Sequence, residues 1–138
     1  MSSTAAVTNS FKQEILQGIH AAADTYNVAL YTAAASLGAS TTAYTASGEV
    51  SGTGYSAGGQ ALSGFTVSIS GNVAYLTWSS NPSWPSSTLT GVVTALIYNA
   101  SKSNKSVCVL TFPSASTAGG PFTLVLPAAG ATSPVTLT

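Results

Sequence analysis

The first apolar pattern in the chain has the period of an amphipathic helix. Ser10 and Gln13 have the spacing of a capping box, in which each side chain bonds the backbone N–H of the other residue, so the helix is expected to begin at Ser10. The apolar stripe that follows covers roughly 13 residues at spacings of three and four. It consists of Phe11, Ile15, Leu16, Ile19, Ala22 and Ala23. Residues 1–9 are small and polar, and we expect them to form a flexible N-terminal arm.

After the predicted helix the apolar period changes to two, which is typical of strands. Residues 26–32 place Val28 and Leu30 on one face and Ala29 and Tyr31 on the other. Two alternating segments, 65–70 and 73–78, are separated only by a Gly-Asn pair, which predicts a tight hairpin. This alternation places Trp78 in the core.

Further strand patterns continue to the C-terminus. Residues 89–98 and 107–112 predict a second hairpin, and 122–126 and 135–137 predict short final strands bounded by prolines. The segment 33–64 is rich in Gly, Ser, Thr and Ala and is too long to lack structure, so short strands are expected near 42–45 and 60–62. We therefore predict a mainly β fold, an antiparallel β-sandwich or barrel with one N-terminal α-helix, in a single domain over residues 10–138.

Charge is the most unusual feature of the composition. Six charged side chains make up 4% of the 138 residues and cancel to a net charge of zero, whereas an ordinary soluble domain has roughly 25% charged residues. The surface must therefore be built largely from Ser, Thr, Gly, Ala, Asn and backbone. Because a near-zero net charge favours association, we expect the chain to bind copies of itself.

The same composition argues against two other kinds of partner. Three lysines and no arginine provide no cationic cluster for phosphate, so we expect no nucleic acid partner. No apolar run approaches the roughly 20 residues that cross a bilayer. The first ten residues also lack a basic region followed by an apolar stretch, so neither a membrane partner nor a signal peptide is expected.

The motifs that suggest catalysis do not have the context they need. Gly54 to Gly58 match the G-x-S-x-G nucleophile elbow around Ser56, but a triad also needs an acid and then a histidine later in the chain, and neither follows Glu49. We interpret this segment as a turn and predict no catalytic residue. The chain is not expected to be an enzyme.

Metal and cofactor sites are not expected either. His20 and Asp24, four residues apart on the predicted helix, could share a hydrogen bond on one face, or they could close the last turn of the helix or hydrogen-bond a neighbouring loop. One histidine, one cysteine and three carboxylates offer no three-ligand cluster with metal-site spacing. Cys108 alternates with Leu110 and Phe112 and is predicted to be a small core residue.

Glu49 is the only acid after Asp24, and glycines surround it. It could accept hydrogen bonds from the backbone N–H groups of its own loop. Alternatively, it could pair with Lys12 or with a lysine of a neighbouring subunit. Proline-rich residues 78–87 form a second candidate loop, which would display an aromatic side chain. The candidate interface residues are Lys12, Glu49, Tyr55, Trp84, Lys102 and Lys105.

Several segments, taken in their order and spacing, resemble a family of small virion proteins of tailed bacteriophages. They are SFKQEIL at 10–16, GIH at 18–20, VALYT at 28–32, EVSGTGY at 49–55 with GG at 58–59, and LIYN at 96–99. Asn27, Val93 and the Thr111-Phe112-Pro113 segment stand where the family has charged residues. The resemblance implies a structural protein without enzymatic activity, assembled into virions in the host cytoplasm.

Three functional hypotheses follow from the sequence. The first is a capsid cement or decoration protein that binds copies of itself and the major capsid protein. The alternative within the virion is a tail, collar or fibre-attachment protein bound to tail proteins. The other class is a carbohydrate-binding module, in which exposed aromatic rings would stack on sugars. Its candidate rings are those of Tyr44, Tyr55, Trp78 and Trp84.

Overall fold

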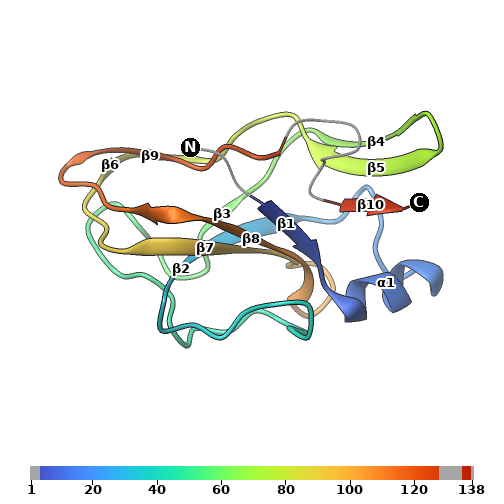
Figure 1. The fold of residues 1–138 in the computed structure, drawn as a ribbon, viewed down its shortest axis with the longest axis horizontal. Coiled ribbons are helices and arrows are strands. Elements are labelled where there is room, and N and C mark those ends of the chain that lie inside the picture. Colours follow the sequence, from blue (N-terminus) through green and yellow to red (C-terminus); the bar gives the residue numbers. More distant parts are fainter. Residues whose placement is uncertain (1–3, 128–134, 138) are drawn as a thin grey trace.

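The computed structural model describes residues 4–127 and 135–137 and has a mainly β fold with one short N-terminal helix, as predicted (Figure 1). Along the chain the elements are β1 (Thr4–Val7), α1 (Asn9–Leu16), β2 (Tyr26–Thr32), β3 (Gln60–Ala61), β4 (Phe65–Ser70), β5 (Val73–Trp78), β6 (Ser83–Ser87), β7 (Val92–Asn99), β8 (Lys105–Ala115), β9 (Gly120–Thr123) and β10 (Val135–Leu137). The strands form a five-stranded sheet in the order β1-β8-β7-β2-β3, a three-stranded sheet β10-β5-β4 and a two-stranded sheet β6-β9. All of these pairings are antiparallel.

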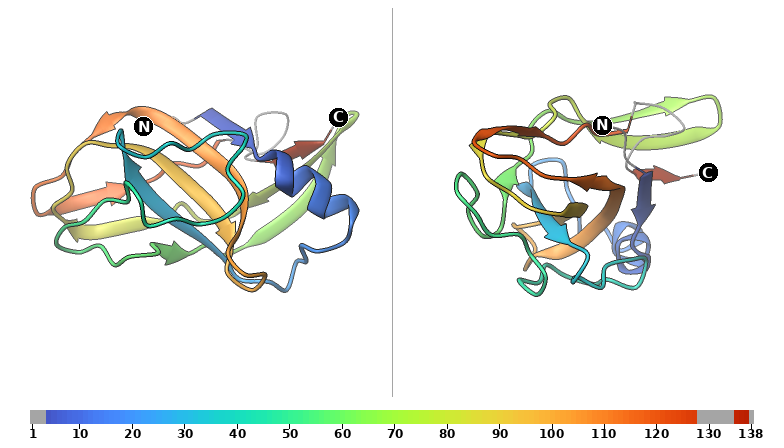
Figure 2. Two further views of the ribbon diagram at one scale, coloured as in Figure 1. Left: turned by 90° about the horizontal axis from the view of Figure 1, so that it is seen from below. Right: turned by 60° about the vertical axis from the view of Figure 1, so that its left-hand side comes forward.

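The main core lies between the five-stranded sheet and the two smaller sheets (Figure 2). Val28, Ile97 and Leu110 contribute from the large sheet, and they share one buried cluster with Trp78 of β5 and Phe122 of β9. Burial of these large apolar side chains is the dominant stabilising contribution to the fold. The buried positions of Trp78 and Cys108 confirm their predicted places in the core.

The strand β2 is buried on both faces. Val28 and Leu30 face the main core, while Ala29 and Tyr31 belong to a second buried cluster on the other face of the sheet, as their alternation predicted. That second cluster is covered by side chains of the loop after β2, namely Ala35, Leu37 and Tyr44. The glycine-rich segment therefore has a structural role, because it covers one face of the large sheet.

Both predicted hairpins are confirmed. In the first, Ser70 pairs with Val73 across the Gly-Asn turn. In the second, β7 pairs with β8, although β8 continues three residues beyond the predicted end at residue 112. Of the two short strands expected in the segment 33–64, β3 is present, but residues 42–45 contribute only one bridge, between Ala43 and Lys105.

The helix is shorter than predicted and is capped by a different residue. The hydroxyl of Thr8, not that of Ser10, accepts the hydrogen bond from the Phe11 N–H at 3.4 Å. The chain leaves the helix after Leu16, and Gly18 has a φ of 71°, a conformation that ends helices. Apolar spacing continues past this glycine, which is why the sequence overestimates the length. No helix in the described part of the chain is long and apolar enough to cross a membrane.

The expectation of a flexible arm over residues 1–9 is wrong for the residues that the structure describes there. Thr4–Val7 form β1, which pairs with β8 so that Val7 lies opposite Cys108. Thr8 then caps the helix, which begins at Asn9. The segment therefore supplies an edge strand of its own sheet.

Candidate functional site

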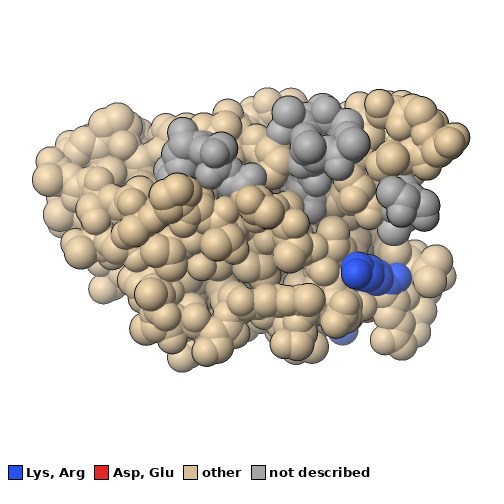
Figure 3. All heavy atoms as spheres, viewed as in Figure 1, with Lys and Arg blue, Asp and Glu red and all other residues tan. Residues whose placement is uncertain are grey.

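The six candidate interface residues do not form one site. Glu49 and Tyr55 meet in the loop beside β2, and the Tyr55 ring packs against Trp84, which is buried in the core. The three lysines lie near α1 and the turn between β7 and β8. Figure 3 shows the lysine atoms gathered beside α1, while the rest of that face is uncharged.

Ion pairs join the helix region to the β7–β8 turn. Glu14 accepts from His20 Nε2 at 3.0 Å and lies 3.3 Å from Lys105 Nζ. Asp24 lies 3.3 Å from Lys102 Nζ. We name this region the charged end, formed by Lys12, Glu14, Asp24, Lys102 and Lys105. It holds five of the six charges of the chain, and it ties two distant segments together.

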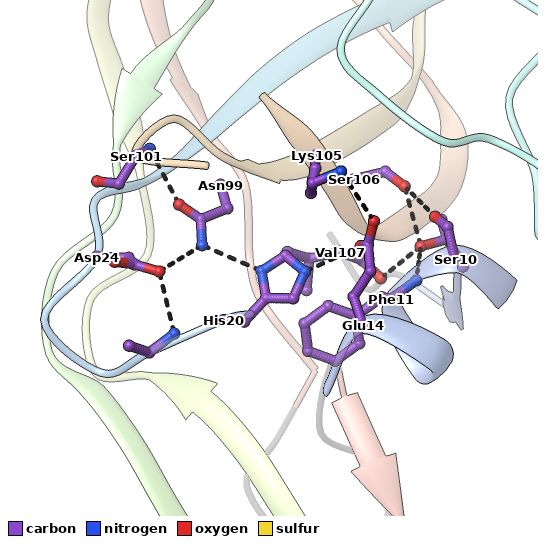
Figure 4. A network of polar contacts seen from close by, with 12 residues as sticks. Ser10, Phe11, Glu14, His20, Asp24, Asn99, Ser101, Lys105, Ser106 and Val107 are labelled. Atoms are coloured by element: carbon purple, nitrogen blue, oxygen red, sulfur yellow. Dashed lines mark hydrogen bonds and ion pairs between the residues drawn. The ribbon is translucent and has the colours of Figure 1, made fainter. Parts of the chain in front are cut away.

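The buried Asn99 side chain connects the two ion pairs (Figure 4). Its Oδ1 accepts from the Ser101 N–H at 3.0 Å, and its Nδ2 donates to Asp24 at 2.8 Å. Because these two bonds fix the amide, Nδ2 also donates to His20 Nδ1, 3.0 Å away. The proton of the neutral imidazole then lies on Nε2 and points at Glu14. Both ring nitrogens are occupied, so neither is available to a substrate.

Of the alternatives for His20 and Asp24, hydrogen bonding to a neighbouring segment is confirmed, and a direct bond on one helix face is wrong. The two residues follow α1 and do not share a helix face; Asn99 links them. The Asn99 hydrogen bond lowers the pKa of Asp24, and although burial opposes this shift, Lys102 and the Ala21 N–H add to it. Sequence spacing gave no signal for Asn99, which lies 79 residues from His20.

A cluster of hydroxyl groups lies beside the charged end (Figure 4). Ser106 Oγ donates to the carbonyl of Thr41 at 2.8 Å, and Thr8 Oγ1 donates to the carbonyl of Val107 at 3.2 Å. Ser10, which was expected to cap the helix, lies 3.2 Å from Ser106 Oγ. These hydroxyls satisfy the backbone around the start of α1.

Glu49 is held by neutral donors. Its carboxylate accepts from the hydroxyls of Tyr44 and Tyr55 and from the Gly58 N–H at 2.7 Å, so it organises its own loop. Tyr55 in turn accepts from the Leu30 N–H at 2.9 Å, which fastens the loop to β2. Among the described residues no ion pair joins Glu49 to Lys12, whose side chain lies exposed on α1.

The two motifs that could suggest catalysis or metal binding do not form such sites among the described residues. No group of three His, Cys, Asp or Glu side chains among them could hold a metal ion. Ser56 lies exposed in a turn that no helix follows, so the nucleophile-elbow geometry is missing. Burial raises the pKa of the Cys108 thiol to about 12, which keeps it protonated and unreactive at neutral pH.

The aromatic side chains do not form an exposed platform. Trp84 belongs to β6 and is 5% exposed, packed against Tyr55 and Phe122. The expectation that residues 78–87 display an aromatic on a loop is therefore wrong. Trp78 is also buried, against Tyr26. Both tryptophans are used by the core, and neither ring is available to stack on a sugar.

An apolar groove lies between α1 and the three-stranded sheet, and sequence reasoning missed it. Its volume is about 100 Å³. Alternation indicated an apolar face on β4 and β5. It could not show that the neighbouring elements leave part of this face uncovered. The groove is lined by Phe11, Ile15, Val67, Ala74, Tyr75, Leu76 and Val135.

Comparisons with protein families, curated proteins and solved structures find no match to this chain.

Proposed function

We propose that this chain is a non-enzymatic structural component of a tailed-phage virion, in the capsid cement or decoration class. The observation that carries the proposal is the distribution of charge. Five of six charged residues lie at the charged end, and the sixth, Glu49, is bound by its own loop. The β-sheets therefore present a nearly uncharged surface of hydroxyls, backbone and small side chains.

Such a surface suits permanent contact with other proteins. Burying an ion at an interface costs several kcal/mol of desolvation, whereas hydroxyl and backbone groups exchange water for protein hydrogen bonds with little net cost. A protein fixed in a shell contacts neighbours on several sides. A weakly charged β fold can make those contacts without displacing the hydration of ions. The resemblance to small phage virion proteins supports a virion as the particle in which these contacts are made.

Imaging of the native particle tests this proposal. Purified particles of the phage whose genome encodes the chain would be labelled with an antibody against it and reconstructed with capsid symmetry imposed and then relaxed. Copies on the capsid lattice are the expected result. Copies confined to the tail, collar or fibre base would overturn the cement role, and their absence from purified particles would overturn the virion role.

A further inference from the structure

The strand β4 forms the outer edge of the three-stranded sheet. The strand order of this sheet is β10-β5-β4, so one side of β4 has no neighbouring strand in the described part of the chain. Figure 2 shows the β4–β5 hairpin extending beyond the rest of the fold. An edge strand of this kind presents a row of unpaired N–H and C=O groups that can pair with another strand.

The hairpin register determines which backbone groups face outward. Ser70 and Val73 close a two-residue turn, so they form a hydrogen-bonded pair. The pairs Ser68 with Tyr75 and Thr66 with Thr77 follow the same pattern, so these residues bond to β5. The N–H and C=O groups of the alternate residues point away from β5. We name Phe65, Val67 and Ile69 the outward residues.

Two of the outward residues also carry uncovered apolar side chains, while Phe65 packs against the main core. Val67 is 63% exposed and Ile69 is 73% exposed. Both lie on the face of the sheet that continues into the apolar groove, which Val67 helps to line. Natural edge strands are commonly protected by charge, proline or a covering segment. β4 contains neither charge nor proline, and no charged residue lies between Glu49 and Lys102.

We propose that β4 pairs antiparallel with β4 of a second copy of this chain, about a two-fold axis at Val67. In this register Val67 lies opposite Val67 of the second copy, and Phe65 lies opposite Ile69. All three outward residues then exchange backbone hydrogen bonds, and the two three-stranded sheets become one six-stranded sheet. The two identical edges meet without repulsion because neither is charged.

The uncovered area is large enough to matter for such a dimer. The exposed parts of Val67 and Ile69 amount to roughly 230 Å² per copy, or roughly 460 Å² for two copies, which is about a quarter to two fifths of a stable interface of roughly 1,200–2,000 Å². The backbone of a six-residue strand and the groove beside it supply additional area. This inference rests on the self-association in the proposed function, and it names the surface that carries it.

Amide hydrogen exchange of the purified chain, followed by NMR at low and high protein concentration, tests the pairing. The amides of Thr66, Ser68 and Ser70 are expected to be protected at both concentrations because they bond to β5. The amides of the outward residues are expected to exchange at least about tenfold more slowly in the associated state. Equal exchange of the outward amides in dilute and associated samples would overturn the edge pairing.

Matched variants separate this inference from the broader proposal. Val67→Pro removes an outward N–H that the single chain does not use, and it should weaken self-association about tenfold or more. Val67→Lys places a charge at the two-fold axis and should have the same effect if the proline disturbs the fold. Ser70→Lys adds the same charge far from the axis and should associate like the original chain.

Light scattering gives the outcome for each variant, and circular dichroism checks that each remains folded. If the original chain associates and both Val67 variants associate as strongly as it does, the β4 contact is overturned, but self-association stands. If the original chain stays monomeric at high concentration, both the β4 contact and the expected self-association are overturned.

Discussion

Glu49 is stabilised by hydroxyl and backbone donors without a neighbouring cation. Tyr44 and Tyr55 point their hydroxyls at its carboxylate, and Gly58 donates its N–H. Burial first, and then the hydrogen bond to Glu49, raises the pKa of Tyr44 to about 12. The hydroxyl therefore stays protonated at neutral pH and continues to donate. This acid holds a loop in place.

Replacement of the Glu49 carboxylate by an amide should destabilise the fold. In Glu49→Gln the single carbonyl oxygen cannot accept all three donors, and the amide nitrogen would face a hydroxyl or an N–H. The free energy of unfolding should fall by about 1–3 kcal/mol, measured by urea denaturation. Lys12→Gln is the control, since Lys12 is exposed and the change also removes one charge. Equal stability of Glu49→Gln and the original chain would show that the tyrosine contacts contribute nothing.

Asp24 should contribute a pH-dependent part of the stability. The Asn99 hydrogen bond lowers its pKa below the ordinary value of 3.8, so the folded state binds this proton more weakly than the unfolded state. The contribution is then fully present above pH 3.8 and is lost as the pH falls through the lower, folded pKa. The stability difference between the original chain and Asp24→Asn should therefore shrink on acidification from about pH 6 to below about pH 3.

Urea unfolding of both proteins across this range measures the difference. Asp24→Asn is nearly isosteric and leaves an amide oxygen that can still accept from Asn99. A difference that stays constant with pH would mean that the folded and unfolded pKa values of Asp24 are equal.

At the level of secondary structure, substitutions at Thr8 and Ser10 test which of these two residues caps α1. Thr8→Ala removes the cap of Phe11 N–H and a buried bond to the Val107 carbonyl, and it should cost about 1–2 kcal/mol of unfolding free energy. Ser10→Ala removes contacts to Ser106 and Thr41 only. Thermal and urea unfolding should therefore rank Thr8→Ala as the more destabilised variant. The reverse order would restore the capping box predicted from sequence.

Strands were easier to predict than the helix because their signal is local. Alternation in residues 26–32 assigned Val28 and Tyr31 to opposite faces, and the Gly-Asn turn fixed the β4–β5 register. The helix boundaries depended on features that apolar spacing does not record. Thr8 lies in a segment anchored by β1, and Gly18 ends the helix although the apolar pattern continues.

The candidate sites depend on contacts between distant segments, so little of them could be predicted from the sequence. The bond from Asn99 to His20 spans 79 positions. The prolines around Trp84 suggested a displayed ring, but β9 places Phe122 beside it. Val67 and Ile69 had a core-like alternation, and only the packing of the sheets shows that nothing described covers them. The alternation of apolar residues identifies the apolar face of a strand, but the packing of the sheets determines whether that face is buried.

At the level of the whole molecule, the charged end and the β4 edge provide two chemically different surfaces. The charged end contains lysines beside acids, whereas the β4 edge is apolar and uncharged. Their different dependence on salt identifies the surface that copies of the chain use. Contacts between exposed charges weaken as salt shortens the screening length, but apolar burial and backbone pairing do not depend on screening.

Self-association through β4 should therefore be unchanged between low and about molar sodium chloride. Sulfate should strengthen it, because this anion favours burial of apolar surface. Light scattering at fixed protein concentration measures both effects. Loss of association in sodium chloride would place the contact at the charged end, where Lys12→Gln should then weaken it. Because these measurements use the purified chain alone, they assign the interface between copies whichever part of a particle the chain occupies.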